Sequence, residues 1–300
     1  MKTTLTLALL STTLLAAPAA PKMRPDPPIQ CDSCAEWNAP RAPFRVFGNT
    51  YFVGPAGLGS VLVTSDAGHV LLDGALPQSA PLIDANIRAL GFRTEDVRVI
   101  VNSHAHFDHA GGIAALQRAS GATVAASAAG ARALERGEPV PEDPQFAFGR
   151  ATNAFPAVKR VRVIEDGETL RVGPLAVTAH LTPGHTPGST SWTWRSCEGA
   201  RCLDVVYADS LNAVSAPGFR FSGDATHPSL VEAFRQSIAT VEGLSCDILL
   251  AVHPGFADMD RKLAARAQGA ASDPFIDPGA CRVYAANARQ ALERRLQQEK

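Results

Sequence analysis

Apolar residues recur along the chain in two patterns, one that predicts strands and one that predicts helices. Short runs rich in valine, isoleucine, leucine and threonine predict strands at 51–72 (several in succession), 97–101, 123–126, 158–164, 168–172, 175–181, 191–194, 203–207 and 248–252. Apolar residues on one side of a helical turn predict helices at 79–90, 113–118, 128–136, 230–242 and 282–298. Strands followed by helices, twice along the chain, predict an α/β protein in which two sheets are sandwiched by helices.

Composition and charge add little to this picture. With 46% hydrophobic and 19% charged residues, the chain has enough apolar material for one large domain or two merged halves. Its net charge of −1 and the lack of a basic patch argue against nucleic acid as a partner, and no protein partner is evident. Residues 138–153 are polar and contain prolines, and we expect this irregular segment to overhang a functional site.

The N-terminus has the pattern of a secretory signal. Lys2 precedes an apolar stretch at 5–15 and an A-x-A site at 17–19, which predicts a signal peptide at 1–19. The apolar stretch is too short to cross a bilayer as a helix. We therefore expect a periplasmic or secreted protein without a membrane span, whose N-terminal tail occupies residues 20–43.

The stretch from 102 to 112, NSHAHFDHAGG, contains the densest candidate chemistry. His104 and His106 alternate on extended chain and so point to one side, while Asp108 and His109 come where the chain turns. Three imidazoles and a carboxylate within six positions are typical of a metal site. The alternative is a polar loop in which Asp108 only caps the next helix, but a cap requires no histidines.

Two further histidines and one aspartate lie in turns after apolar runs. His185 lies in TPGHTPG and His253 in AVHPG, where prolines and glycines hold the side chain in place. Asp73, in LLDG, has two interpretations. It either accepts a hydrogen bond from a ligating histidine and so sets its tautomer, or it is a simple turn aspartate before Gly74.

Together these motifs resemble the metallo-β-lactamase superfamily. SHAHFDHAGG, TPGHTPGSTSW and YADSL resemble in particular the class B β-lactamases of subclass three, from about residue 44 to the C-terminus. The resemblance implies a metallo-β-lactamase domain over 44–300. Its fold is expected to be a four-layer αββα sandwich with the metals at one edge, between the two sheets.

The resemblance also implies two Zn²⁺ per chain. His104, His106 and His185 are expected to bind the first ion, and Asp108, His109 and His253 the second. Three ligands leave each ion an open position, as in catalytic sites. Zinc lowers the pKa of bound water from about 15.7 to about 7, so metal-bound hydroxide is expected to attack the lactam carbonyl. Asp108 is expected to orient this nucleophile with its free oxygen.

Substrate contacts are expected in two segments. By resemblance, Ser210 and Asn212 are candidates to bind the carboxylate of a β-lactam, and Gln145 in the overhanging segment is a third. Adjacent residues on a strand face opposite ways. Only one of Asp209 and Ser210 is therefore expected to face the metals. The resemblance of YADSL implies that Ser210 lines the cleft and that Asp209 points away and holds the turn.

The six cysteines of an exported chain predict three disulfides. Cys197 and Cys202 would join the two ends of a hairpin, and Cys246 with Cys281 would tie the last predicted strand to the C-terminal helix, as the resemblance also implies. Cys31 and Cys34 then remain as the third pair. Their C-x-x-C spacing is also compatible with a redox-active or metal-binding pair.

Residues outside these motifs are assigned structural roles. His69 is placed in a turn, His180 in a strand and His227 in a loop, and none has neighbouring ligands in sequence. Trp192 and Trp194 alternate with threonines on a strand, which favours packing over substrate stacking.

Three classes of function follow from these observations. The first is zinc-dependent hydrolysis of the amide bond of β-lactam antibiotics, which would confer antibiotic resistance. The second is another hydrolase on the same fold, such as a lactonase or thioesterase. The third is a metal-binding protein without catalysis, which the open coordination positions argue against. No G-x-S-x-G or S-x-x-K signature points to a serine nucleophile.

Overall fold

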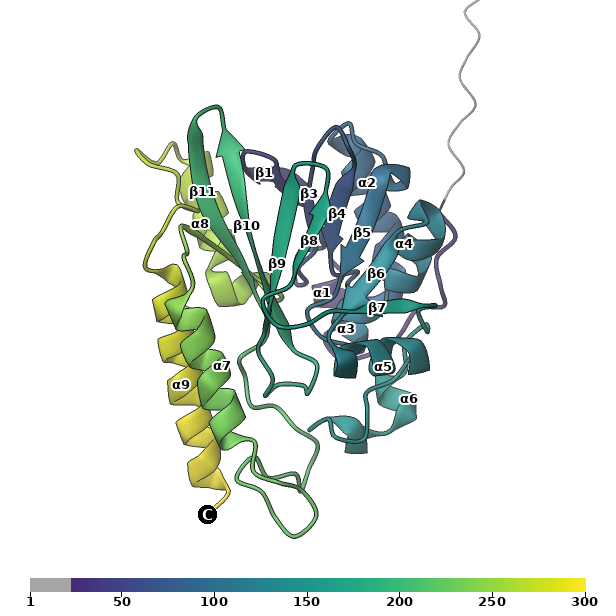
Figure 1. Ribbon diagram of the computed structural model, residues 1–300, viewed down its shortest axis with the longest axis vertical. Coiled ribbons are helices and arrows are strands. Elements are labelled where there is room, and N and C mark those ends of the chain that lie inside the picture. Colours follow the sequence, from purple (N-terminus) through teal and green to yellow (C-terminus); the bar gives the residue numbers. More distant parts are fainter. Residues whose placement is uncertain (1–22) are drawn as a thin grey trace, which may run out of the picture.

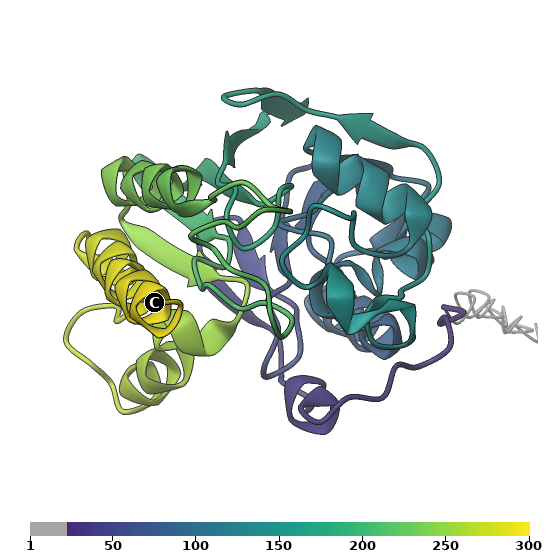
Figure 2. The ribbon, with the colours of Figure 1, turned by 90° about the horizontal axis from the view of Figure 1, so that it is seen from below.

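Two β-sheets lie face to face, and helices cover the outer face of each, which makes four layers (Figure 1). The computed structural model describes residues 23–300, so the signal peptide expected at 1–19 lies outside the described residues. Figure 2 gives the view from below, in which the green and yellow C-terminal helices lie on one side of the sheets and the blue and teal helices on the other. The expected αββα sandwich is confirmed.

The first sheet contains seven strands in chain order. They are β1 (Phe44–Phe47), β2 (Thr50–Phe52), β3 (Val61–Val63), β4 (His69–Leu72), β5 (Val97–Val101), β6 (Thr123–Ala126) and β7 (Val161–Val163). Strands β1 to β4 pair antiparallel, and β4 to β7 pair parallel. Parallel neighbours require crossover connections, and these are α2 (Ala80–Ala89), α4 (Ile113–Ser120) and α5 (Ala128–Arg136).

The second sheet has five strands in the order β12-β11-β10-β9-β8. Their bounds are β8 (Thr169–Val172), β9 (Leu175–Leu181), β10 (Thr190–Glu198), β11 (Arg201–Ala208) and β12 (Ile248–Ala251). The pairs are antiparallel except β11 with β12, which α7 (Val231–Gly243) connects as a crossover. Helix α9 (Ala280–Gln298) packs beside α7 on the outer face (Figure 1).

Alternation along the strands supplies apolar side chains to three cores. Leu71 of β4 packs against the helices of the first sheet, whereas its neighbour Leu72 packs between the two sheets. In the second sheet Tyr207 faces the layer between the sheets, and Ala208 faces α7 and α9. Because both faces of the sheets are covered, β3, β4 and β12 are buried along their whole length.

The described part of the N-terminal tail is anchored to the domain. It includes the short helix α1 (Cys34–Trp37), and Cys34 belongs to the core under the first sheet. The main chain of Ile29 exchanges two hydrogen bonds with the Gln78 side chain, at 3.1 and 2.9 Å. These contacts bring Trp37 to the same edge of the domain as His253, with ring centroids 5.4 Å apart.

Most predicted elements are confirmed, several of them to the residue, such as β6, α5 and β9. Several elements were not predicted: β1, α8 (Met259–Ala267) and the short helices α1, α3 (Phe107–Ala110) and α6 (Arg150–Asn153). Helix α8 is rich in charged residues and has no long apolar pattern. His69 was placed in a turn, which is wrong: it begins β4, is buried, and packs against the Phe92 ring at 5.3 Å.

All three predicted disulfides are present, Cys31–Cys34, Cys197–Cys202 and Cys246–Cys281. Trp192 and Trp194 are buried, which confirms their packing role, and their indole nitrogens donate to Asn102 O and Thr50 Oγ1. Among residues 23–300, no helix combines the length and apolar character needed to cross a membrane.

Candidate metal centre

Loops that follow strands of both sheets bring the predicted ligands together at one edge of the domain. His104 and His106 follow β5, and Asp108 and His109 lie in the short helix α3 (Phe107–Ala110) directly after them. His185 comes from the turn between β9 and β10, and His253 follows β12. Residues from four segments of the chain therefore meet at one place.

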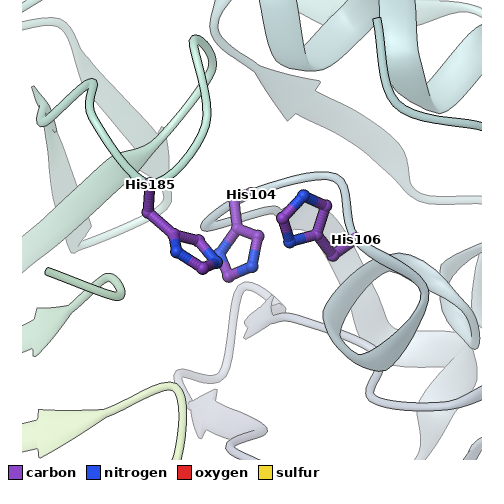
Figure 3. A group of neighbouring side chains, drawn as sticks. All are labelled: His104, His106 and His185. Carbon is purple, nitrogen blue, oxygen red and sulfur yellow. The ribbon is translucent and has the colours of Figure 1, made fainter. Parts of the chain in front are cut away.

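Two groups of side chains are close enough to share an ion. The ligand atoms of His104, His106 and His185 lie within 4.8 Å of one another, and the three rings point toward a common centre (Figure 3). His104, Asp108 and His109 form the second such group. His253 joins it, because its Nε2 lies 3.5 Å from Asp108 Oδ2 and its ring centroid lies 4.8 Å from that of His109.

Protein oxygens occupy one ring nitrogen of four of these histidines, and for His106 the oxygens are those of Asp143. His104 Nδ1 donates to Asp209 Oδ1 at 2.6 Å, and His185 Nδ1 donates to the main-chain oxygen of Asn212 at 2.9 Å. His253 Nδ1 donates to Gly57 O at 3.3 Å. Such bonds leave the opposite nitrogen as an acceptor and fix the ring orientation, as around metal ligands in general.

The free nitrogens test whether the site fits a metal. His104 Nε2 and both ring nitrogens of His109 are buried and have no hydrogen-bond partner. Unpaired buried polar atoms are costly, and a metal ion would provide the partner that these nitrogens lack. Imidazole nitrogens with one carboxylate are the ligand types that zinc prefers, so the residues present fit this ion.

Burial and mutual repulsion set the charge of these groups. Burial lowers the pKa of His104 well below its usual value, and the neighbouring histidines lower it further. Burial likewise lowers the pKa of His185 and of His253 to about 4. Burial opposes the ionisation of Asp108, but His109 and His253 outweigh it and hold the Asp108 pKa well below the usual range. At neutral pH these four groups are three neutral imidazoles and a carboxylate, the forms that bind cations. Burial of His106 and His109 is outweighed by the carboxylates of Asp143 and Asp108, which raise the pKa of these two histidines.

The position of Asp209 corrects the prediction for the segment YADSL. Asp209 was expected to point away from the site, but its carboxylate is fully buried and accepts the hydrogen bond from His104. Ser210 was expected to line the cleft, but it is 1% exposed and its Oγ is buried without a partner. Alternation allows one of the two residues to face the site, and the resemblance of YADSL indicated the wrong one.

Asp73 does not accept a hydrogen bond from a ligating histidine. Its carboxylate accepts hydrogen bonds from Asn102 Nδ2, from the main chain and hydroxyl of Ser103, and from the Tyr207 hydroxyl, at 2.6 to 2.9 Å. None of these donors is a histidine. Asp73 therefore holds the loop that precedes His104, and Asp209 is the residue that sets a histidine tautomer.

One functional residue, Asp143, was missed. Its carboxylate oxygens lie 3.1 and 3.2 Å from His106 Nε2, and its Oδ1 also accepts the main-chain N–H of Gln145. Asp143 lies in the irregular segment 138–153, where only its charge marked it in the sequence. This contact confirms that the segment reaches the site.

A cavity of about 700 Å³ opens over the ligands. Its walls include His106, Asp108, His185 and His253, together with Gln145 and Asn212, two of the three candidate substrate contacts. Ser210 does not line it. Trp37, Val214 and Phe256 provide apolar surface, and Glu36 and Asp260 provide carboxylates.

Known proteins with this fold are similar to the chain over most of its length. The Rm3 metallo-beta-lactamase is 56% identical with a TM-score of 0.86, and the match covers 90% of this chain and 99% of that one. MEM-A1, a subclass B3 metallo-beta-lactamase from a soil metagenome library, is 50% identical with a TM-score of 0.84, over 88% and 98% of the two chains.

A curated relative is more distant. A hydroxyacylglutathione hydrolase of Anaeromyxobacter dehalogenans is 33% identical over 158 residues, which are 53% of this chain and 47% of that protein. The match therefore spans about half of that relative's length. Residues 59–253 match the sequence model of the metallo-beta-lactamase superfamily, and this range contains every predicted metal ligand. Fold, ligand constellation and this match agree, and the chain belongs to the metallo-beta-lactamase superfamily.

Proposed function

We propose that this protein is an exported zinc hydrolase that opens the amide bond of β-lactam antibiotics and so confers resistance to them. The observation that supports this most is the pair of adjoining ligand groups at the base of the cavity, in a chain 56% identical to a metallo-beta-lactamase over 90% of its length. Three disulfides agree with an oxidising compartment, the periplasm or the exterior.

Two ligand sets are proposed for two Zn²⁺. His104, His106 and His185 would hold the first, and Asp108, His109 and His253 the second. Two zinc ions in these positions would supply a Lewis acid for the lactam carbonyl and a nucleophile at neutral pH. With its low pKa, Asp108 stays ionised and accepts the hydrogen bond of the attacking water, which orients that water.

The cavity walls support a proposal for how a β-lactam would be held. No lysine or arginine lines the cavity among the described residues, so neutral donors take the place of an ion pair. We assign the amides of Gln145 and Asn212 to the substrate's carboxylate, and Trp37 and Phe256 to its apolar side chains. A buried Ser210 has no part in this proposal.

The relation to the hydroxyacylglutathione hydrolase gives the competing function, hydrolysis of a thioester. In relatives of that kind an aspartate at this strand end is expected to bridge both metals. Asp209 instead accepts a hydrogen bond from His104 and lies outside both ligand groups. The geometry therefore favours the β-lactam.

Activity on defined substrates tests the proposal. We expect the zinc-loaded protein to open a penicillin, a cephalosporin or a carbapenem, followed by loss of the lactam absorbance, and to act poorly on S-lactoylglutathione and on an acyl-lactone. Turnover of the thioester or lactone alone would overturn the assignment.

Metal content tests the ligand sets. We expect elemental analysis to find two zinc ions per chain, and chelation to abolish activity until zinc is restored. His104→Ala should remove metal from the first site and most turnover, since its Nε2 is one of the unpaired nitrogens. His227→Ala is the matched control, because His227 lies in an exposed loop away from the centre, and it should retain both ions. Full activity without metal would end the mechanism.

A further inference from the structure

A second cavity, of about 560 Å³, lies next to the catalytic one, between α8, α9 and the turn after His253. We call it the accessory cavity. Asn212, Gly255 and Phe256 line both cavities and form the wall between them. None of the six proposed zinc ligands lines the accessory cavity.

Hydrogen bonds and apolar side chains define the walls of the accessory cavity. Tyr284 of α9 lines the accessory cavity, and its hydroxyl donates to Asp209 O at 2.7 Å and accepts from Leu211 N at 3.3 Å. Apolar surface comes from Leu249, Ala288 and the exposed side chains of Phe256 and Val283. Preformed hollows of this size that combine apolar surface with a few polar groups are typical of sites for small organic molecules.

One cation in the lining of this cavity, on a side chain that is mostly buried, has no polar partner in the described residues. Lys262 of α8 is 5% exposed, and its ammonium makes no hydrogen bond or ion pair with any residue between 23 and 300. Its Nζ lies over the Phe275 ring, 5.8 Å from the ring centroid. A partly desolvated ammonium without a counter-ion is unfavourable, and an anion in the cavity would offset this cost.

The nearby carboxylates do not neutralise Lys262 by contact. Asp258 is paired with Arg261 at 2.9 Å, and Asp277 Oδ1 accepts the main-chain N–H of Gly279. Arg261 and Arg294 add two exposed cations to the lining. With three cations and two carboxylates, the lining has an excess of positive charge.

We propose that the accessory cavity is a second ligand site that binds a small amphipathic organic anion. The apolar body of the ligand would lie against Tyr284, Ala288 and Val283, and its carboxylate or sulfonate would accept hydrogen bonds from Lys262. This site is separate from the zinc centre, and the proposal does not rest on the proposed catalytic function.

Two dyes that differ only in a sulfonate test this site in the zinc-loaded protein. They are 8-anilinonaphthalene-1-sulfonate, which is an anion, and the neutral N-phenyl-1-naphthylamine, each titrated by fluorescence. Lys262→Met keeps the length of the side chain and removes its charge. We expect it to weaken binding of the sulfonate by about tenfold or more and to leave the neutral dye nearly unchanged.

Two controls complete the experiment. Lys159→Met removes an exposed lysine outside the cavity and should not alter binding of either dye. Ala291→Phe, on the α9 wall, should fill the cavity and weaken both dyes, so the proposal stays testable if Lys262→Met does not fold. Mercaptoacetate, a thiol that can ligate zinc, should not displace the sulfonate. Equal sulfonate affinity of wild type and Lys262→Met, or displacement by mercaptoacetate, would contradict the proposal.

Discussion

Each of four histidines in the metal centre has one ring nitrogen engaged by a protein oxygen. The acceptors are the side chains of Asp209 and Asp143 and the main-chain oxygens of Asn212 and Gly57. Carboxylate acceptors raise the basicity of a ligating imidazole more than carbonyl acceptors do, because they stabilise positive charge on the ring. His104 and His106, both assigned to the first ion, have the carboxylate acceptors.

Asp209→Asn should therefore weaken zinc binding. The amide oxygen can still accept from His104 Nδ1, so the ring keeps its orientation and only the charge is lost. We expect zinc affinity to fall by about 10–100-fold, with the fold retained, as measured by competition with a chromophoric chelator. Asp204→Asn, on the strand β11 that precedes Asp209 but partly exposed beside Arg195, is the control and should bind zinc as the wild type does. Unchanged affinity in Asp209→Asn would show that Asp209 does not act through His104.

At the scale of elements, close backbone packing positions the ligand loops. A Cβ on Gly112 would lie 2.2 Å from Gly74 O, so the loop after β4 and the start of α4 approach only because glycine is present. Gly184, in the turn that presents His185, has φ near +151°, and a Cβ there would meet the Phe234 ring at 2.6 Å. Gly112 and Gly184 thus help to fix where the histidines of 104–109 and His185 lie.

The C-terminal helix is tied to the long loop between β11 and α7 by Glu299. Its carboxylate accepts the main-chain N–H groups of Phe221 and Ser222 and the Nε–H of Arg295, at 2.8 to 2.9 Å. Burial opposes ionisation, but these donors outweigh it and lower the pKa of Glu299 to about 2. The bonds therefore form with the ionised group and stabilise the folded state.

Glu299→Gln should lower the free energy of unfolding in a pH-dependent way. Because the pKa is lower in the folded state than the usual 4.5, the contribution is complete above about pH 4.5 and is lost as the pH falls toward 2. We expect a deficit of about 1–2 kcal/mol at pH 7 that shrinks between pH 5 and pH 3, measured by urea unfolding.

Glu293→Gln is the control for this substitution. Glu293 lies on the same helix in an exposed ion pair with Arg235, so its loss should cost about 0.5 kcal/mol or less. A deficit of Glu299→Gln that stays constant from pH 7 to pH 3 would refute the linkage.

At the scale of the molecule, the site forms only where the edges of both sheets meet. The first sheet supplies four proposed ligands after β5, and the second supplies His185 and His253. Cys246–Cys281 joins the segment before β12 to α9 across 35 positions. It therefore holds two layers of the second half together.

Removal of this disulfide should destabilise the whole molecule. In the chain-entropy description, a loop of about 35 residues corresponds to a loss of roughly 3–4 kcal/mol for Cys246→Ala with Cys281→Ala, against about 1–2 kcal/mol for Cys31→Ala with Cys34→Ala. Denaturant unfolding of both double variants under identical conditions gives the comparison. Equal losses would mean that strain or residual denatured structure, and not loop length, sets the stabilisation.

Much of the fold and of the ligand set could be predicted from the sequence because the signals are local. Period-two and helical patterns placed β6, α5 and β9, and the histidines of 102–112 lie within a single motif. β1 was not predicted because four residues are too few to show a clear alternation. α8 was not predicted because it has charged residues where an apolar stripe would mark a helix.

The sequence by itself determined which residues can bind metal and in which elements they lie, because donor chemistry and periodicity are properties of neighbours along the chain. Only the tertiary structure decided which ring nitrogen of each histidine is free, since the acceptors come from distant segments. Asp209 is 105 positions from His104, and Asp143 is 37 positions from His106. The same reason explains the choice between Asp209 and Ser210. Alternation allows either residue to face inward, and the choice depends on His104, which another sheet holds in place.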